Sequence, residues 1–564
     1  MSINSISYSL SPEIEDDVRQ HIAEWNTESK VTRVWEKDAA VWTGEDEAKW
    51  LGWLTIGQEE AADTAKYSDL QKDIEEAGFT DILLMGMGGS SLCPEVLAVT
   101  FGKTNFHILD STVPSQVVAV EAKLDLAKTL FVVASKSGST LEPNLFKQYF
   151  FDRVSQISDA PGKQFVAITD PGSKMEQIAK ADGFRHIFYG KPEVGGRFSA
   201  LSAFGLTAAA AMGLDVDILL HRANAMAELC KRHNPEENPG ALLGLALGVC
   251  HKLGRDKLTI FTSPDVYDLG AWLEQLVAES TGKNGVAIIP VDREPILDAE
   301  NYYNDRVFVH IGVKNAVTDE NTYSKLEDIE RAGHPVIRIE LESLYHISQE
   351  FFRWEFATAV TGAVMGINPF NQPDVESAKI EARKITEEYE QTGSLPAEDP
   401  FFEADGISLF SSEANVKELN ELAAARSLAG YLKAHLSRIG PNDYFALLGY
   451  IEMNAENERA LQSIRQKVLG QELAATCLGF GPRFLHSTGQ AYKGGADNGV
   501  FLQITSDDTV DVPVPGQQYT FGVVKAAQAR GDFQVLLDRG RRALRVHLAD
   551  VDSGLKHIIE LWAK

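Results

Sequence analysis

Residues 81–91, DILLMGMGGSS, are the stretch that decides the fold. A short, uninterrupted apolar run is followed by a glycine-rich turn and then by the apolar segment LCPEVLAVT. Such a run is typical of a strand buried on both faces, as in a parallel sheet. The turn leads into a helix whose first N–H groups are unpaired, and this is where open parallel sheets bind ligands.

The same strand–turn–helix unit recurs along the chain. Further apolar runs end at residues 110, 135, 170 and 190, so five buried strands predict one doubly wound parallel sheet. A second alternation has predicted strands at 258–263, 285–291, 307–313 and 335–341, and a third has them at 444–451, 474–480, 499–505 and 533–540. The third block echoes the second, and the repeat aligns the aromatic helix EFFRWEFATAV with QYTFGVVKAAQA.

These patterns predict an α/β protein of doubly wound parallel sheets, flanked by helices. The segment GSLPAEDPFFEADG (393–406) is rich in Pro, Gly and acidic residues and is predicted to be a linker. The expected divisions are an N-terminal helical segment whose five tryptophans pack in the core (1–60), a first α/β domain (61–215), a helical connection (216–250), a second α/β domain (251–392) and a C-terminal α/β domain (393–564).

The composition is that of ordinary globular protein, with 44% hydrophobic and 24% charged residues among 564. The four cysteines are far apart and form no C-x-x-C pair, which indicates neither a zinc site nor disulfides and fits a reducing cytoplasm. The start lacks the pattern of a signal peptide, and the longest apolar stretch (201–214) is too short to span a membrane. A net charge of −28 argues against nucleic acid or an anionic membrane as partner, so an anionic substrate would require local donors.

Two loops offer such donors at predicted strand ends. The loop 86–91 places Gly89 and Ser90 at a helix start, although a dinucleotide-binding turn or a purely structural glycine turn is an alternative. The second loop, SKSGST, lacks the P-loop pattern but combines hydroxyls and an ammonium group, which suit a phosphate; Thr140 could instead serve only as a helix cap. Together the loops predict a small phosphate site, whose candidate residues in the second loop are Ser135, Lys136, Ser137, Ser139 and Thr140.

Four further motifs carry reactive side chains. Arg197 in VGGRFS is either an anion clamp or the partner of a structural carboxylate. Gln275 and Glu279 share a helix face, and Glu279 in the last turn before Gly282 suits a general base, although a surface Glu is the ordinary alternative. Lys379 follows the rigid loop NPFNQP on a helix, where most lysines are solvated, and His486 lies in HSTGQ, where a proton-transfer His would be useful.

Taken together, the motifs resemble those of the phosphoglucose isomerase family, built from sugar-isomerase (SIS) domains. GMGGSSLCPEVL resembles GIGGSxLGP, SKSGSTLEP resembles SKTFTTxET, VGGRFSALSAFGL is similar to VGGRYSxxSAxGL, QLVAESTGK to QxxxESxGK, and NPFNQPDVESAK to NPFDQPGVExxK. The five motifs occur in family order over roughly residues 80–380.

The resemblance implies roles for individual residues. The two donor loops would hold the substrate phosphate, Arg197 would steady an oxyanion, and Glu279 would move the proton between C2 and C1. Gln275 would contact the sugar chain, and Gln372 and Lys379 keep the family's spacing, with Lys379 acting at the ring oxygen.

One motif departs from the family pattern. The ring-opening His of the family lies in an HSxGQ-like loop before the Lys motif, whereas HSTGQ here follows it, in the third block. We therefore expect a third, SIS-like block to supply His486, an arrangement that resembles the isomerase half of bifunctional transaldolase/phosphoglucose isomerases. The family site is usually completed by a partner's His, so both a homodimer and a monomer remain open.

The resemblance implies reversible isomerisation of glucose 6-phosphate and fructose 6-phosphate through a cis-enediolate, without metal or cofactor, in glycolysis and gluconeogenesis. Two alternatives remain at this stage. One is an isomerase that also accepts mannose 6-phosphate. The other is a non-catalytic SIS module that senses a phosphosugar, which would need the phosphate loops but neither Glu279 nor Lys379.

Overall fold

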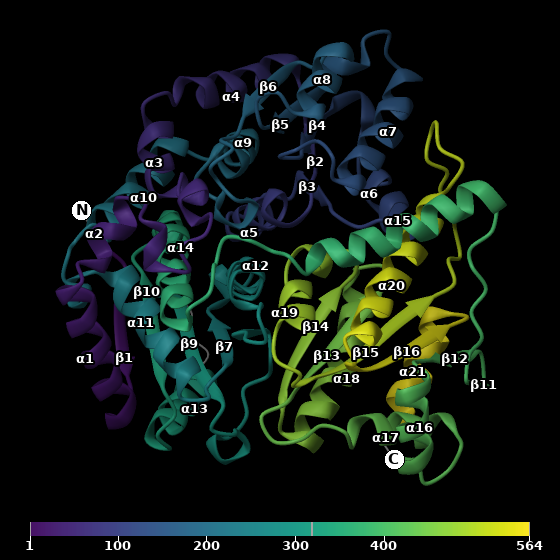
Figure 1. The fold of residues 1–564 in the computed structure, drawn as a ribbon. Helices are drawn as coiled ribbons and strands as arrows, with labels where there is room; N and C mark the ends of the chain where they lie inside the picture. Colours follow the sequence, from purple (N-terminus) through teal and green to yellow (C-terminus); the bar gives the residue numbers. More distant parts are fainter. Residues whose placement is uncertain (1, 317–319, 563–564) are drawn as a thin grey trace.

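The first sheet contains the five strands expected from the apolar runs. The computed structural model describes residues 2–316 and 320–562. Strands β2 (Asp81–Met85), β3 (Phe106–Leu109), β4 (Thr129–Ala134), β5 (Phe165–Thr169) and β6 (His186–Tyr189) pair in parallel in the order β3-β2-β4-β5-β6 (Figure 1). Alternate strand residues enter two separate hydrophobic clusters, with Leu84 in one and Leu83 in the other. Both faces of the sheet are therefore buried, which explains the uninterrupted apolar runs.

The second sheet has four parallel strands and one antiparallel edge strand. Its order is β1-β10-β9-β7-β8, with β7 (Lys257–Thr262), β8 (Ile289–Asp292), β9 (Arg306–Val313) and β10 (Val336–Leu341) parallel. Strand β1 (Ser5–Ser9) pairs antiparallel with β10. The prediction that residues 1–60 are a purely helical segment was therefore wrong at its start. The β-branched and aromatic residues of β1 gain strand structure only by pairing with a sheet edge far along the chain, which local patterns do not reveal.

The third sheet repeats the strand order of the second. It runs β11-β12-β16-β15-β13-β14, with β13 (Tyr444–Tyr450), β14 (Ala475–Phe480), β15 (Gly499–Ser506) and β16 (Arg542–Leu548) parallel. Strands β11 (Phe402–Ala404) and β12 (Ile407–Phe410) form an antiparallel hairpin on β16. The order β14-β13-β15-β16 corresponds strand for strand to β8-β7-β9-β10 and to β3-β2-β4-β5. The expected fold class, parallel α/β sheets with a third block of the same kind, is confirmed.

Two predictions within the third block were wrong. Residues 533–540 are not a strand, because α20 (Phe521–Asp538) covers almost all of them and the strand β16 begins at Arg542. The helix α20 is buried nearly all round, and a short apolar run inside such a helix cannot be distinguished from a buried strand. The predicted correspondence between the two aromatic helices is also wrong. The helix α14 (Ile347–Met365) follows β10 as α21 (Val551–Trp562) follows β16, whereas α20 lies between β15 and β16.

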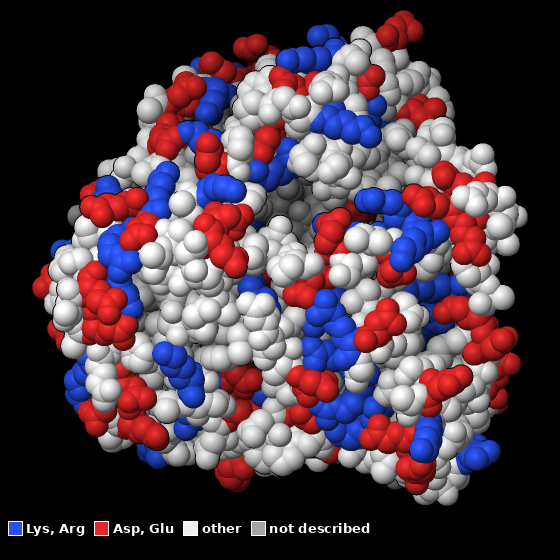
Figure 2. All heavy atoms as spheres, viewed as in Figure 1, with Lys and Arg blue, Asp and Glu red and all other residues white. Residues whose placement is uncertain are grey.

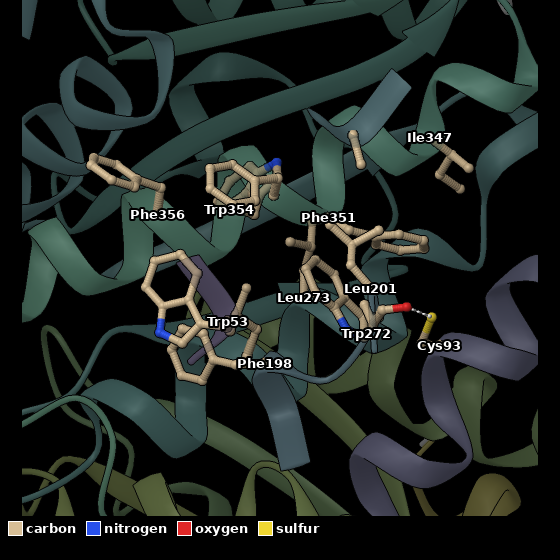
Figure 3. Packing of buried hydrophobic residues seen from close by; sticks show 14 of the residues in the cluster. Trp53, Cys93, Phe198, Leu201, Trp272, Leu273, Ile347, Phe351, Trp354 and Phe356 are labelled. Atoms are coloured by element: carbon tan, nitrogen blue, oxygen red, sulfur yellow. Dashed lines mark hydrogen bonds between the residues drawn. The ribbon is translucent and has the colours of Figure 1, made fainter. Parts of the chain in front are cut away.

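The helix α14 forms the centre of the largest core cluster. Nearly all its residues are buried, among them Trp354 and Phe356, and the ring of Phe356 lies 6.3 Å from that of Trp53 (Figure 3). The rings of Trp53 and Phe198 are 5.2 Å apart, so a tryptophan of the N-terminal segment packs against the residue that follows Arg197. Among the described residues, no helix is long and apolar enough to cross a membrane.

Charged side chains of both signs are interspersed over the surface in Figure 2, and a hollow lies where the first sheet's part of the molecule meets the other two. The helix α15 (Val375–Thr392) runs along this boundary between the first sheet and the third (Figure 1). The loops singled out in the sequence converge on the same boundary.

Candidate active site

The glycine loop after β2 touches three other motifs. A Cβ at Gly88, which has φ +56°, would lie 2.7 Å from Gln275 Nε2 and 2.9 Å from the carbonyl oxygen of His486. A Cβ at Gly89 would lie only 1.9 Å from the carbonyl oxygen of Gly196. The glycines are therefore needed for close approach, because any side chain here would push apart loops that the sequence separates by more than 100 residues.

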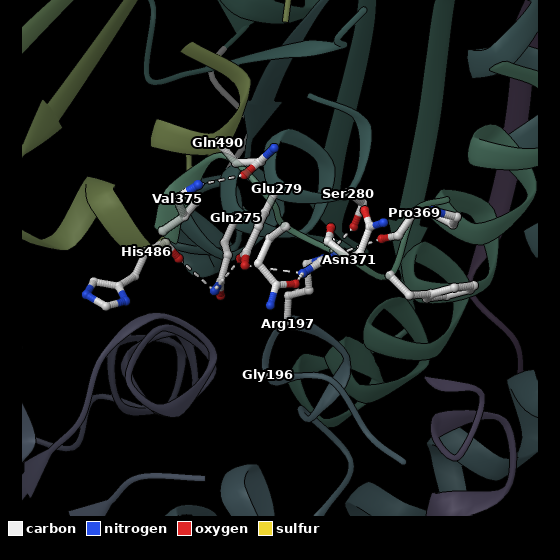
Figure 4. A network of polar contacts seen from close by, with 12 residues as sticks. Gly196, Arg197, Gln275, Glu279, Ser280, Pro369, Asn371, Val375, His486 and Gln490 are labelled. Carbon is white, nitrogen blue, oxygen red and sulfur yellow. Dashed lines mark hydrogen bonds and ion pairs between the residues drawn. The ribbon is translucent and has the colours of Figure 1, made fainter. Parts of the chain in front are cut away.

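Glu279 and Arg197 form an ion pair at the centre of this junction. Glu279 lies in the last turn of α12 (Leu269–Thr281), which ends at Gly282, as the sequence predicts. Arg197 Nη1 is 3.2 Å from Glu279 Oε1, and the two side chains are 2% and 13% exposed (Figure 4). An accessible carboxylate against a buried, fixed cation is an arrangement that can exchange a proton while negative charge is stabilised nearby.

Arg197 also holds the loop that leads to α15. Its Nη2 donates to the carbonyl oxygens of Pro369 (2.6 Å) and Asn371 (3.1 Å), and its Nη1 donates to Gln372 Oε1 at 3.0 Å. Its Nε donates to Ser280 Oγ at 2.7 Å. Burial lowers the pKa of Arg197, and the Glu279 carboxylate opposes that shift. The arginine thus fixes Gln372 and the end of α12 in one place.

Gln275 connects the carboxylate to the His486 loop. Its Nε2 donates to Glu279 Oε2 at 3.1 Å and to the carbonyl oxygen of His486 at 2.8 Å. Within the described part of the chain its buried Oε1 has no hydrogen-bond partner. A buried acceptor without a partner is costly, so this oxygen is a natural point for a hydroxyl to bind.

The SKSGST loop follows β4 and offers free hydroxyls. Ser137 Oγ and Ser139 Oγ are 2.6 Å apart, and both residues, with Thr140, line a cavity of about 530 Å³. Thr140 occupies the N-cap position of α7 (Leu141–Ser155), but its side chain makes no capping hydrogen bond. The hydroxyls therefore line the cavity, and the hydrogen bonds that the Ser137 and Ser139 hydroxyls make among the described residues stay within this loop.

The first two residues of that loop are placed differently. The ammonium group of Lys136 is 2.6 Å from Asp170 Oδ2 and donates to the carbonyl oxygen of Pro192 at 3.0 Å. Ser135 is 2% exposed, and its Oγ has no partner among the described residues. Neither residue is among those that line the 530 Å³ cavity.

Lys379 and His486 also line the cavity. Lys379 lies in the second turn of α15, 43% exposed, with Glu376 Oε2 3.7 Å from its Nζ. The imidazole of His486 points away from the Glu279 cluster (Figure 4), and its Nε2 is 3.0 Å from Glu142 Oε1. The two predicted groups thus line the same cavity as the SKSGST hydroxyls.

Glu142 is a residue that the sequence reasoning missed. It is buried in the first turn of α7, and Gln528 Nε2 also donates to its Oε1 at 2.7 Å. Burial alone would raise its pKa, but His486 above all, with a smaller contribution from Lys379, brings the pKa below its ordinary value. The signal was present in the sequence, because Glu142 belongs to the quoted segment SKSGSTLEP.

Gln490, in the HSTGQ motif, was also missed and fixes the base of the site. Its Nε2 donates to the carbonyl oxygen of Gly282 at 2.8 Å, and its Oε1 accepts from the backbone N–H groups of Asp374 and Val375. One side chain of the third block therefore joins the end of α12 to the start of α15. Among the described residues, no group of three or more His, Cys, Asp or Glu side chains is arranged to hold a metal ion.

The fold of parallel α/β sheets with polar loops gathered at strand ends is shared by two solved structures. One is the hypothetical protein TT0462 of Thermus thermophilus (TM-score 0.56, 24% identity, 67% of this chain and 99% of that one). The other is a glucose-6-phosphate isomerase from Chlamydia trachomatis (TM-score 0.50, 21% identity, 65% of this chain and 79% of that one).

Residues 68–291 match the family model of phosphoglucose isomerase. The glucose-6-phosphate isomerase of Methanocaldococcus jannaschii is 26% identical over 336 residues, 54% of this chain and 83% of that protein. That of Thermosynechococcus vestitus is 38% identical over 213 residues, a match that spans only 40% of the cyanobacterial protein and 36% of this chain. The matched stretch includes Arg197, Gln275 and Glu279 but neither Lys379 nor His486.

Proposed function

We propose that this protein catalyses the reversible isomerisation of glucose 6-phosphate and fructose 6-phosphate through a cis-enediolate. The observation that carries the proposal is the Glu279–Arg197 ion pair, which lies beside Gln372 and Gln275. Gln275 also donates to the backbone of His486, which lines the cavity together with the SKSGST hydroxyls. A module that only senses a phosphosugar would have no use for a carboxylate fixed against a buried guanidinium.

Phosphate binding is assigned to the hydroxyls of Ser137, Ser139 and Thr140, with Ser135, Gly89 and Ser90 at the adjoining strand ends. Lys136 adds positive charge next to this loop while its ammonium is paired with Asp170. Because the phosphate lies remote from the reacting carbons, its binding energy can be used to orient the sugar.

Ring opening is assigned to His486 and Lys379, which both line the cavity. Glu142 holds the imidazole of His486, which is thereby placed to exchange a proton with the ring oxygen. Glu279 then takes the proton from C2 and returns it at C1, and Arg197 stabilises the negative charge that develops on the enediolate oxygens.

The whole site is assigned to one polypeptide. His486 comes from the third block and contacts Gln275 and Glu142 of the same chain, so a monomer would have a complete set of groups. The same proposal includes a cytoplasmic location, in keeping with a glycolytic reaction and with four buried, unpaired cysteines.

The first test is a coupled assay of Glu279→Gln with fructose 6-phosphate, with mannose 6-phosphate as a second substrate. Removing a general base is expected to lower kcat by about 10²–10⁴-fold with the fold retained. Glu274→Gln is the matched control, since it makes the same change on the same helix in a different cavity. Near-normal turnover by Glu279→Gln would refute the proposal, and faster turnover of mannose 6-phosphate than of fructose 6-phosphate would refute its choice of substrate.

A further inference from the structure

Arg483 links the loop that carries His486 to the first sheet's part of the molecule. It begins the short helix η11 (Arg483–His486) of the third block. Its Nη1 and Nη2 donate to the two oxygens of Glu95 at 2.5 and 2.9 Å, and its Nε is 2.8 Å from Asp110 Oδ2. Glu95 lies on α5 (Leu92–Thr100) and Asp110 directly after β3. One guanidinium therefore spans two carboxylates of another part of the chain.

The same network reaches His486 a second time through the glycine loop. Asp110 Oδ2 also accepts a hydrogen bond from Ser91 Oγ at 3.0 Å, and Ser91 Oγ is 3.2 Å from the carbonyl oxygen of Gly88. Gly88 is in turn packed against the carbonyl of His486. The helix η11 is thus fixed at its first residue by Arg483 and contacted at its last residue by the loop that Asp110 helps to hold.

The side chains behind η11 leave a cavity, so the position of this helix depends more on the polar network. A cavity of about 280 Å³ is lined by Arg483, Phe484, Ser487 and Thr488 on the η11 side. Apolar contacts therefore do not enclose the helix on that face. Asp110 is 3% exposed, so its charge needs Arg483 as partner. Burial lowers the pKa of Arg483, but Asp110 and Glu95 together raise it above its ordinary value, so the guanidinium stays charged.

We propose that Arg483 is a positioning residue for ring opening, which sets His486 against the substrate through its contacts with Glu95 and Asp110. The inference rests on the proposed role of His486. It predicts a defect confined to cyclic sugars, because displacement of η11 moves His486 while Glu279 and Arg197 belong to other elements. A misplacement of about 1 Å can cost roughly 10²-fold in rate.

The test compares turnover of fructose 6-phosphate with that of 5-deoxyfructose 6-phosphate, which lacks the ring-closing hydroxyl and stays open. Arg483→Met is expected to lower kcat/KM on the cyclic sugar by about 10²-fold and on the open-chain sugar by less than about threefold. Glu95→Gln and Arg483→Lys disturb the clamp with less risk to folding and are expected to give the same preference in weaker form. Arg185→Met, which breaks a bidentate pair with Asp73 in the first domain, is the matched control. It should leave the ratio of kcat/KM on the cyclic sugar to kcat/KM on the open-chain sugar unchanged.

Equal losses on both substrates, or an unchanged ratio in folded Glu95→Gln and Arg483→Lys, would overturn the inference. His486→Ala separates this failure from that of the proposed function. If His486→Ala slows only the cyclic sugar and the Arg483 and Glu95 variants do not, the assignment of His486 stands and the role of Arg483 is refuted.

Discussion

At the scale of single residues, two carboxylates differ in their neighbours and in their proposed roles. Glu279 lies beside Arg197 and keeps 13% exposure, so a substrate can reach it. Glu142 is 4% exposed and holds the Nε2 of His486. In the proposed mechanism, Glu279 exchanges a proton with the substrate and Glu142 holds the imidazole of His486. The sequence predicted Glu279 from its position before a glycine. Glu142 lies in the quoted segment SKSGSTLEP, but its role depends on contact with His486, 344 residues away, which that segment does not reveal.

The Glu142–His486 contact leads to a prediction at this scale. Glu142→Gln removes the carboxylate that holds the His486 ring, while an amide remains near Gln528. We expect kcat on cyclic fructose 6-phosphate to fall by about tenfold or more, with little change on the open-chain analogue. Steady-state kinetics on both sugars checks this, and an equal fall on both would show that Glu142 acts on the proton transfer rather than through His486.

Glu274 provides a second prediction, about pH and stability. Burial, with help from Asp292, raises its pKa to about 8 from an ordinary 4.5. The folded state therefore keeps a proton that the unfolded chain releases above about pH 4.5, so this group lowers stability as pH rises from about 4.5 to about 8. Glu274→Gln should leave the Tm near that of wild type at pH 5 and raise it at pH 8.5. Thermal unfolding at both values is the measurement, and a difference between the two proteins that does not grow with pH would contradict it.

At the scale of elements, the strands were predictable because burial on both faces leaves continuous apolar runs. All five strands of the first sheet fall within the runs read from the sequence. Two elements, β1 and the end of α20, were not predicted from the sequence. Strand β1 depends on pairing with β10, more than 320 residues away. The helix α20 is buried on nearly every face, so its hydrophobic pattern does not show a helical period. The sequence also does not predict that these loops come together, because this depends on how the three sheets pack.

The close approach at Gly88 gives a prediction for one element, the loop after β2. Gly88→Ala places a methyl group 2.7 Å from Gln275 Nε2 and 2.9 Å from the His486 carbonyl. We expect it to displace both and to lower kcat by about 10²-fold, beyond the strain of a positive φ. Gly78→Ala is the matched control, because Gly78 has φ +72° with nothing within 4 Å of its Cβ position. The control should lose about 1 kcal/mol of stability and keep its kcat, and equal kcat values for the two variants would refute the steric argument.

At the scale of the whole molecule, three sheets share one strand order, and the third has become part of the site. The second and third sheets each end in an antiparallel edge, made by β1 in one and by the β11–β12 hairpin in the other. The third block contributes His486, Gln490 and Gln528 to contacts with the other two. The net charge of −28 leaves the surface acidic, and the candidate site meets an anion with hydroxyls and a few fixed cations.

The central claim is that one chain holds a complete site, with His486 supplied by its own third block. The most direct measurement mixes Glu279→Gln with His486→Ala, after joint unfolding and refolding, and assays fructose 6-phosphate turnover. If each site is built within one chain, neither variant can complement the other, and the mixture should be no more active than the sum of its parts. Recovery of a substantial fraction of wild-type activity in the mixture would contradict the claim, because it would mean that His486 and Glu279 of one site come from different chains.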